Sequence, residues 1–255
     1  MPGRGVYPVR SMPSMKLTKR PTRRAPNRKQ GTATARVTAP APARRSRRNA
    51  GRRPRAEQIE RTRNALFRAA IVVVGQYGYP GASIARITTR ARVAQGTFYN
   101  YFESRQALLD MLLPTMGRHL VDYIRDRVGD EEDEVRREEL RLRGFFEFLN
   151  ENPEFYRILH EAEIFAPDGH REHMANLERG YVRALGRSRE RGAMEGYAEA
   201  DLEVLAYILM AARDYLSMRF VRGRNGVAMV PEPVIDAYMK LMRHGLFGGR
   251  YDRSK

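Results

Sequence analysis

The chain has 255 residues and a formal net charge of +17, and it contains no cysteine. Without cysteine it has no disulfides, no thiolate zinc sites and no thiol-based redox sensing. No stretch approaches the roughly 20 consecutive apolar residues that a membrane helix requires, so we expect a soluble cytoplasmic protein with no membrane partner.

The positive charge is concentrated near the N-terminus. Residues 1–55 hold 17 of the 47 Lys and Arg residues, 8 of the 14 prolines and no acid, whereas the other 200 residues carry 30 basic and 30 acidic side chains. Residues 1–55 also contain no Phe, Ile or Trp, so this segment can bury too little apolar surface to offset the entropy cost of ordering the chain. We therefore expect residues 1–52 to form a disordered basic arm. Such an arm binds polyanions without sequence preference. Two alternatives remain: a solvated leader without a role, or residues upstream of a misplaced start.

Residues 59–77 are expected to form one amphipathic helix, because apolar side chains recur at steps of three and four residues. The members of this stripe are Ile59, Leu66, Phe67, Ala70, Ile71, Val73, Val74 and Tyr77. Gly78 then favours a helix end and Pro80-Gly81 a turn. The hydroxyl of Ser83 can cap the next helix.

Residues 83–102 fit two short helices crossing at a three-residue turn, the spacing of a helix-turn-helix. The positions that such a unit buries hold Ile87, Ala91, Val93, Phe98 and Tyr101, and the small Thr88 lies where the helices approach most closely. The free surface of the second helix then carries polar groups and no acid, which suits a groove lined by phosphates: Gln95, Gly96, Thr97, Tyr99 and Asn100. The alternative is an ordinary helical hairpin from any all-α core.

Downstream, Ser104 can cap a fourth helix that runs through Leu108 to Leu112, with Pro114 near its end. With this helix in place, the sequence resembles the TetR family of bacterial transcription regulators. The resemblance rests on residues 63–79, on Gly96-Thr97-Phe98-Tyr99-Asn100-Tyr101-Phe102 and on Ser104-Arg105-Gln106-Ala107-Leu108, in the family's order and spacing.

The resemblance implies double-stranded DNA as a partner. The DNA-binding residues that we expect are Ser83, Arg92, Gln95, Gly96, Thr97, Tyr99, Asn100 and Arg105. Gln95, Thr97 and Asn100 would face base edges or nearby phosphates, whereas Tyr99 and Arg105 would grip the DNA backbone. Gly96 lacks a side chain, which lets the helix approach closely. A packing role is the alternative for Tyr99.

Three residues depart from the family's pattern. Arg92 stands where the family usually has the turn glycine, so a bulky residue must adopt a left-handed or adjusted turn at a cost of roughly 1 kcal/mol. Ala94 occupies the cap of the recognition helix, where it loses roughly 1 kcal/mol relative to Ser or Thr. Gln95 replaces the common lysine. These departures put the base preference in doubt, and Arg92 could compensate by gaining a phosphate contact.

From residue 115 onward the chain is expected to be helical, with helices over residues 116–128, 134–150, 153–165, 170–190, 199–221 and 232–246. Pro153 suits a first helical position after Asn152, and the acidic run 130–134 reads as a solvated linker that favours the next helix start. The predicted fold class is all-α. We expect a basic arm (1–52), a helix-turn-helix DNA-binding domain (53–114) and a larger helical ligand-binding and dimerisation domain (115–255).

Residues 199–221 carry two apolar stripes, which implies two packing partners. One stripe is Leu202, Leu205, Leu209, Ala212, Leu216 and Phe220; the second is Val204, Ile208, Ala211, Tyr215 and Met218. In the resembling family the last two long helices pair with their symmetry mates as a four-helix dimer interface. The second of these helices would contribute Val234, Ile235, Tyr238, Leu241, Met242, Leu246 and Phe247. The alternative is a helix central in a monomeric bundle.

Aromatic side chains crowd the two helices around Asn152-Pro153, and a subset can line a pocket for a small apolar or aromatic effector. The candidate pocket residues are Phe146, Leu149, Tyr156, Leu159, Ile208, Ala211 and Tyr215. Candidate polar groups, each with an ion pair or a surface position as the alternative, are Arg213, Asp214, His160 and Glu163. His170 and His173 lie one turn apart but lack a third ligand, so we expect no metal and no cofactor.

Neither Gly-x-Ser-x-Gly nor Gly-x-x-x-x-Gly-Lys occurs, so an enzyme is not expected. We expect a homodimeric, ligand-responsive transcription regulator that represses genes at a palindromic operator and is released by its effector. Three alternatives remain. The chain could be an activator of the same family, an architectural protein that binds DNA without sequence preference, or an enzyme that transforms a small molecule in the helical domain.

Overall fold

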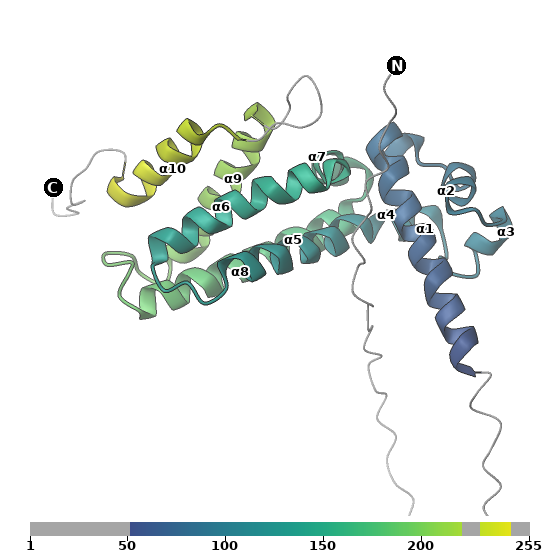
Figure 1. The fold of residues 1–255 in the computed structure, drawn as a ribbon, viewed down its shortest axis with the longest axis horizontal. Coiled ribbons are helices and arrows are strands. Elements are labelled where there is room, and N and C mark those ends of the chain that lie inside the picture. The colour runs from purple at the N-terminus through teal and green to yellow at the C-terminus, as the bar shows by residue number, and fades with distance from the viewer. Residues whose placement is uncertain (1–51, 221–229, 246–255) are drawn as a thin grey trace, which may run out of the picture. The chain divides into compact units, whose positions relative to one another are not determined.

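The computed structural model describes residues 52–220 and 230–245, and every regular element in these ranges is an α-helix (Figure 1). The ten helices of the described ranges are α1 (Arg52–Gly81), α2 (Ile84–Ala91), α3 (Gln95–Phe98), α4 (Arg105–Asp110), α5 (Leu112–Val128), α6 (Glu134–Glu151), α7 (Pro153–Phe165), α8 (Pro167–Glu190), α9 (Asp201–Phe220) and α10 (Glu232–His244). The predicted all-α class is confirmed. The basic arm up to residue 51, together with Leu246 and Phe247, lies outside the described ranges.

Helix α1 confirms the predicted amphipathic helix and begins earlier, at Arg52. The predicted interruption at Gly78 is also confirmed, because this residue has the non-helical φ of 72° and ψ of 171°. Leu66, Ala70 and Val74 recur on one face and are fully buried, because this part of α1 packs against α2, α4 and α7. Ile59 and Tyr77 do not join this core, since 45% and 55% of their surfaces are exposed. Residues 57–61 are exposed, and the ring of Tyr77 packs under the Arg86 guanidinium instead.

Helix α4 is short, and the chain continues into α5 after Met111. The cap predicted at Ser104 is confirmed, because its hydroxyl accepts a hydrogen bond from the Ala107 amide at 3.0 Å. The predicted place of Pro114 near a helix end is wrong. It lies in the first turn of α5, where a helix has unpaired amides and the missing N–H of proline costs nothing.

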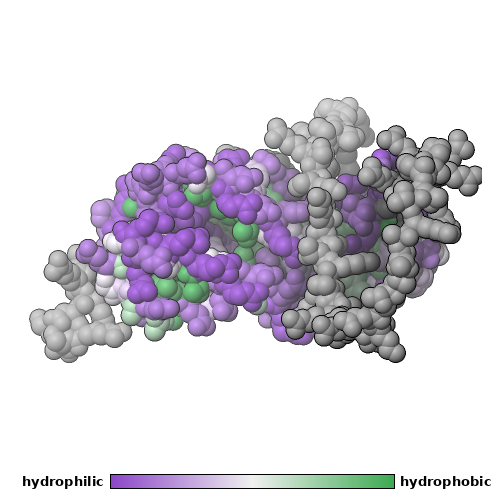
Figure 2. All heavy atoms as spheres, turned by 90° about the horizontal axis from the view of Figure 1, so that it is seen from below, coloured by the Kyte–Doolittle hydropathy of each residue, from purple (hydrophilic) through white to green (hydrophobic). Residues whose placement is uncertain are grey.

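Helices α5 to α10 form the helical body, in which α5 packs on α6 and α8, and α9 packs on α8 and α6. Their bounds follow the predicted ranges, except that α5 and α8 begin earlier than expected. Helix α8 begins at Pro167, which occupies a first-turn position as Pro153 does in α7. On the face shown in Figure 2, hydrophilic residues cover most of the body, with small groups of hydrophobic residues between them.

The acidic run before α6 stabilises that helix directly. Asp133 is the N-cap, and its carboxylate accepts from the Val135 amide at 2.8 Å and the Arg136 amide at 3.3 Å. Glu134 is less exposed than a solvated linker residue, because its carboxylate accepts from the Ser188 hydroxyl at 2.7 Å and pairs with Arg191. These contacts lower the pKa of Glu134 against the opposing effect of burial. The run thus both caps α6 and ties it to the end of α8.

The described residues belong to one compact unit that spans residues 47–255. The boundary expected between residues 114 and 115 falls inside α5, two residues after its start. The division into a DNA-binding and a ligand-binding domain at that residue stays a prediction.

Candidate nucleic-acid interface

Helices α2 and α3 form the predicted helix-turn-helix. Phe98 anchors α3, because its ring is fully buried and lies 5.5 Å from that of Phe102. Ile87 is also fully buried, while Ala91, Val93 and Tyr101 are half-buried against the same core. Thr88 is buried at the approach of the two helices, and its hydroxyl donates to the Ile84 carbonyl at 2.9 Å. The short α3 is therefore held mainly by one aromatic side chain.

The turn between α2 and α3 takes the conformation expected from its unusual residues. Arg92 adopts the left-handed conformation, with φ 57° and ψ 44°, and is the only residue other than glycine with positive φ in the described ranges. Its side chain is exposed. Ala94 is the N-cap of α3 and provides no side-chain hydrogen bond, as predicted. Both features cost stability, so neither is explained by the needs of the fold alone.

The predicted polar set lies on the outer surface of α3 and of the turn that follows it, because α3 ends at Phe98 and leaves Tyr99 and Asn100 in this turn. Gln95, Gly96 and Asn100 are exposed, Tyr99 is 59% exposed, and Thr97 is half-buried. A Cβ atom on Gly96 would meet no atom of the chain within 4 Å, so no internal contact requires glycine there. The exposure of Tyr99 disfavours the packing alternative, although its ring also touches the edge of Phe98. A missing side chain beside amide and phenol groups suits close approach to DNA.

The charge around this surface is positive. Residues 83–102 contain no Asp or Glu, and Arg86, Arg90 and Arg92 are all exposed. Arg86 is engaged within the chain, where it donates to the Gly81 carbonyl at 2.7 Å and lies 4.7 Å from the Tyr77 ring centroid. Within the ranges that the structure describes, the side chains of Arg90 and Arg92 make no hydrogen bond and no ion pair, although the Arg92 amide donates to the Thr89 carbonyl at 3.2 Å. They remain available for phosphates.

Ser83 and Arg105 have structural roles that the sequence revealed only in part. Ser83 caps α2 as predicted, accepting from the Arg86 amide at 3.3 Å. Arg105 is half-buried and donates to two backbone carbonyls, to Ala82 from Nε at 2.8 Å and to Tyr79 from Nη2. The guanidinium that we expected on the DNA backbone thus holds the α1 to α2 connection, and its DNA contact stays a prediction. No sequence signal indicated this partner, which lies more than 20 residues upstream.

The seven candidate pocket residues do not come together. Phe146 and Leu149 are buried in the core on α6, while Tyr156 and Leu159 are half-buried on α7. Ile208, Ala211 and Tyr215 lie on the exposed face of α9, and Tyr215 is 70% exposed. The second apolar stripe of α9 points away from the core of its own chain, because the first stripe and Arg213 occupy the inner face. Sequence periodicity identified both stripes but could not rank them.

The four candidate polar groups separate in the same way. Arg213 is buried and donates to Glu138 at 2.5 Å and to the Tyr181 hydroxyl. Asp214 lies 3.6 Å from Nε2 of His160, and burial raises the pKa of this carboxyl. Glu163 is exposed. For Arg213 the structure therefore supports the alternative of an internal ion pair.

His173 has a packing environment. It is 3% exposed, and a Cβ on Gly117 would lie 2.2 Å from its Nδ1, so the imidazole covers the backbone of α5 closely. Burial lowers its pKa to about 4 and keeps the ring neutral at neutral pH. Among the described residues there is no group of three His, Cys, Asp or Glu side chains that could hold a metal ion.

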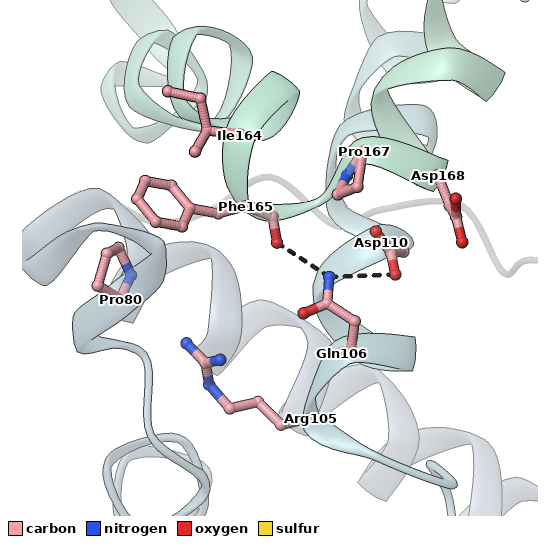
Figure 3. Close-up of a pocket in the computed structure, with 8 residues that line it drawn as sticks. All are labelled: Pro80, Arg105, Gln106, Asp110, Ile164, Phe165, Pro167 and Asp168. Atoms are coloured by element: carbon pink, nitrogen blue, oxygen red, sulfur yellow. Dashed lines mark hydrogen bonds between the residues drawn. The ribbon is translucent and has the colours of Figure 1, made fainter.

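A pocket of about 440 Å³ opens where α1 ends, beside α4 and the junction of α7 and α8. Its lining comprises Pro80, Arg105, Gln106, Asp110, Ile164, Phe165, Pro167 and Asp168. Figure 3 shows the Gln106 amide in the centre, donating to the Phe165 carbonyl at 2.9 Å and to Asp110 at 3.2 Å. None of the predicted pocket residues belongs to this lining. The sequence missed it because its walls come from four separate helices.

Comparison with known proteins decides the family. The sequence model of the bacterial regulatory proteins of the tetR family matches residues 66–112, from the packed part of α1 to the first residue of α5. Residues 66–112 therefore belong to the TetR family. These residues contain the helix-turn-helix that α2 and α3 form.

Two curated relatives align with this chain over very different shares of their length. The uncharacterized HTH-type transcriptional regulator YvdT of Bacillus subtilis is 40% identical over 68 residues, which cover 27% of this chain and 35% of YvdT. The HTH-type transcriptional repressor KstR2 of Mycobacterium tuberculosis is 23% identical over 201 residues, which cover 75% of this chain and 96% of KstR2. The strong similarity to YvdT is therefore confined to about a third of its length, whereas the weaker one spans nearly all of KstR2.

Solved TetR-like structures share the fold of this chain. FadR from Bacillus subtilis, in complex with stearoyl-CoA, has a TM-score of 0.61 at 16% identity, covering 71% of this chain and 98% of FadR. AibR, in complex with isovaleryl coenzyme A and operator DNA, has a TM-score of 0.54 at 18% identity, covering 71% and 97%. These TM-scores show that the chain shares the architecture of the two structures. None of its described helices has the length and apolarity to cross a membrane.

Proposed function

We propose that this protein is a TetR-type transcription regulator, a cytoplasmic homodimer that represses transcription at a palindromic operator. The observation that carries the proposal is the outer face of α3 and the turn after it. Gln95 and Gly96 are exposed on α3, and Tyr99 and Asn100 are exposed on the turn, with no acid in residues 83–102. Two such helices in a symmetric dimer would read half-sites about one helical turn apart, so the operator should mirror the two-fold axis of the protein.

The dimer is supported by the apolar outer face of α9. Val204, Tyr207, Ile208, Tyr215 and Met218 are large, exposed and on one side of the helix, and Leu241 of α10 is exposed as well. Monomeric proteins rarely leave so many neighbouring apolar side chains in water. A second copy of the same face is the occupant that the fold favours, because an isologous contact pairs identical surfaces.

The effector that we propose is an acyl-CoA thioester. FadR from Bacillus subtilis and AibR share this fold and have been crystallised with stearoyl-CoA and isovaleryl coenzyme A. In this chain α6 and α7 bring together Phe145, Phe146, Phe148 and Phe155, an apolar environment suited to an acyl chain once it opens. The ligand would act by binding one conformation of the dimer more tightly than the other.

The experiment that tests the operator proposal is selection of binding sites from a random pool of duplex DNA by the full-length protein. We expect an enriched inverted repeat. Asn100→Ala should abolish the enrichment, while Asn176→Ala on the distant surface of α8 should preserve it. A pool that stays random with the wild-type protein would overturn operator binding and favour the architectural alternative.

The selected operator then tests the effector and the sign of regulation. We expect acyl-CoA thioesters to release the protein from the operator in a manner that depends on chain length, whereas free coenzyme A leaves the complex intact. The acyl-CoA proposal would be overturned if both compounds released the protein from the operator equally well, or if neither released it. In transcription from a promoter carrying the operator, we expect less product with the protein than without it. More product would identify an activator.

A further inference from the structure

The connection between α1 and α2 is bent at a defined point. Gly78 has φ 72° and ψ 171°, which takes the chain out of helical conformation near the end of α1. Tyr79 follows with no exposed surface, and the cap of α2 comes four residues later at Ser83. We call residues 78–82 the bend. The path of the chain through the bend sets the orientation of the helix-turn-helix relative to α1.

An ion pair on α7 satisfies the two backbone groups that the bend separates. In an unbroken α-helix the Tyr79 N–H would donate to the Gly75 carbonyl. Here the Tyr79 N–H donates to Oε2 of Glu161 at 2.9 Å, and the Gly75 carbonyl accepts from Nη1 of Arg157 at 3.2 Å. Arg157 and Glu161 pair with each other at 3.1 Å. One charged pair thus replaces the missing helical hydrogen bond.

The packing leaves no room for another side chain at this contact. A Cβ on Gly78 would lie 2.8 Å from Oε2 of Glu161, and a Cβ on Gly75 would lie 2.3 Å from Cγ of Glu154. Both glycines therefore allow α1 to approach α7 closely, and α1 packs more extensively against α7 than against any other described helix. The carboxylate of Glu161 reaches the bend because these two backbones are so near.

Helix α4 holds the same segment from its carbonyl side. Arg105 donates to the Tyr79 carbonyl and, at 2.8 Å, to the Ala82 carbonyl. The N–H of Tyr79 therefore donates to a carboxylate from α7, and its C=O accepts from a guanidinium from α4. Hydrogen bonds with one charged partner are stronger than neutral ones, so the two side chains fix the bend more firmly than turn geometry would.

We propose that Glu161 and Arg105 are positioning residues that determine which half-site spacing the dimer accepts. The inference rests on the proposed homodimeric operator binding. If the α9 faces join the two helical bodies, the separation of the two α3 helices depends on the bend in each copy. A firmly held bend restricts the pair of α3 helices to one spacing of the major groove. If the bend is released, each helix-turn-helix can rotate relative to its helical body, and the dimer then accepts other half-site spacings.

The test measures affinity for a series of operators in which the selected half-sites are moved apart or together by one and two base pairs. Wild-type protein should prefer one spacing by a large factor. Glu161→Ala should reduce that preference by about tenfold, a factor equal to 1.4 kcal/mol of discrimination, with affinity for an isolated half-site unchanged. Glu161→Gln retains an oxygen that can accept from the Tyr79 amide, so it should restore part of the preference.

The control is Glu163→Ala, which removes an exposed carboxylate from the same helix. It should leave the spacing profile as in the wild type. Arg105→Gln should broaden the profile like Glu161→Ala, providing a second variant with a different risk to folding. A wild-type protein without any spacing preference would overturn the proposed dimeric operator binding. A sharp wild-type profile that Glu161→Ala and Arg105→Gln retain, or that Glu163→Ala also broadens, would overturn the role of the bend instead.

Discussion

The guanidinium of Arg213 and the carboxylate of Glu138 form an ion pair in the protein interior, 2.5 Å apart, between α9 and α6. The hydroxyl of Tyr238 on α10 donates to the same carboxylate oxygen at 2.6 Å, and Tyr181 on α8 accepts from the arginine. Although burial alone would lower the pKa of Arg213, Glu138 and the tyrosines raise it. Four helices of the body therefore meet at one charged pair.

Removing one member of this pair should destabilise the protein strongly. Arg213→Met removes the nearer of the two cations that pair with the Glu138 carboxylate and leaves only Arg141, at 3.5 Å. We expect this loss to lower the free energy of unfolding by about 3 kcal/mol. Denaturant unfolding measures the effect. Arg219→Met on the exposed end of α9 is the control and should change stability by less than about 0.5 kcal/mol. Equal loss in both variants would show that the pair has no special role.

Readout by α3 predicts a selective loss of operator affinity. Asn100→Ala or Gln95→Ala should weaken operator binding by about 1–3 kcal/mol, because amide side chains hydrogen-bond to base edges. Binding to random DNA should be nearly unchanged. Titrations of operator and random duplexes at the same salt concentration compare the two losses. An equal loss on both DNAs would contradict base readout by these side chains.

Because one face of α9 is exposed, a substitution on that face tests the dimer without disturbing the core. Ile208 is 54% exposed, whereas Leu209 beside it is buried against its own chain. Ile208→Glu should produce a folded monomer, because an unpaired charge in an apolar interface costs several kcal/mol. Leu209→Glu should unfold the chain instead. Sedimentation with circular dichroism separates the two results, and a monomeric wild-type protein at micromolar concentration would contradict the dimer.

The basic arm predicts a salt effect that is independent of DNA sequence. Each phosphate that the arm neutralises adds about −0.9 to the slope of log affinity against log salt. Deleting residues 1–50 should flatten this slope and lower affinity for all DNA alike, while the operator-to-random ratio and the thermal midpoint change little. Identical slopes for the full-length and shortened proteins would mean that the arm does not contact DNA.

The burial of His173 predicts lower stability in mild acid. Its pKa is about 4 in the folded protein, against 6.5 for an ordinary histidine. Between these values the unfolded chain binds the proton and the folded chain does not. The contribution of the neutral ring is present above pH 6.5 and is lost as the pH falls toward 4, by up to about 3 kcal/mol. His173→Leu should flatten this part of the pH profile of unfolding. His170→Gln should flatten it less, because burial is the larger cause of the lowered pKa of His173 and the charge of His170 the smaller one. A profile unchanged by His173→Leu would contradict this cause.

The sequence by itself determined the helices, the helix-turn-helix and the outward set on α3, because the spacing of apolar residues, the caps and the prolines act over a few residues. It also indicated the strained turn at Arg92 and the uncapped Ala94. Only the tertiary structure decided which stripe of α9 is buried, since both stripes are apolar and the choice depends on α6 and α8. The partners of Arg105, Glu161 and Arg213 are likewise products of packing. Apart from Arg157, which lies one helical turn from Glu161, each of these partners lies more than 20 residues away along the chain. No local pattern encodes a contact made by two helices when they dock.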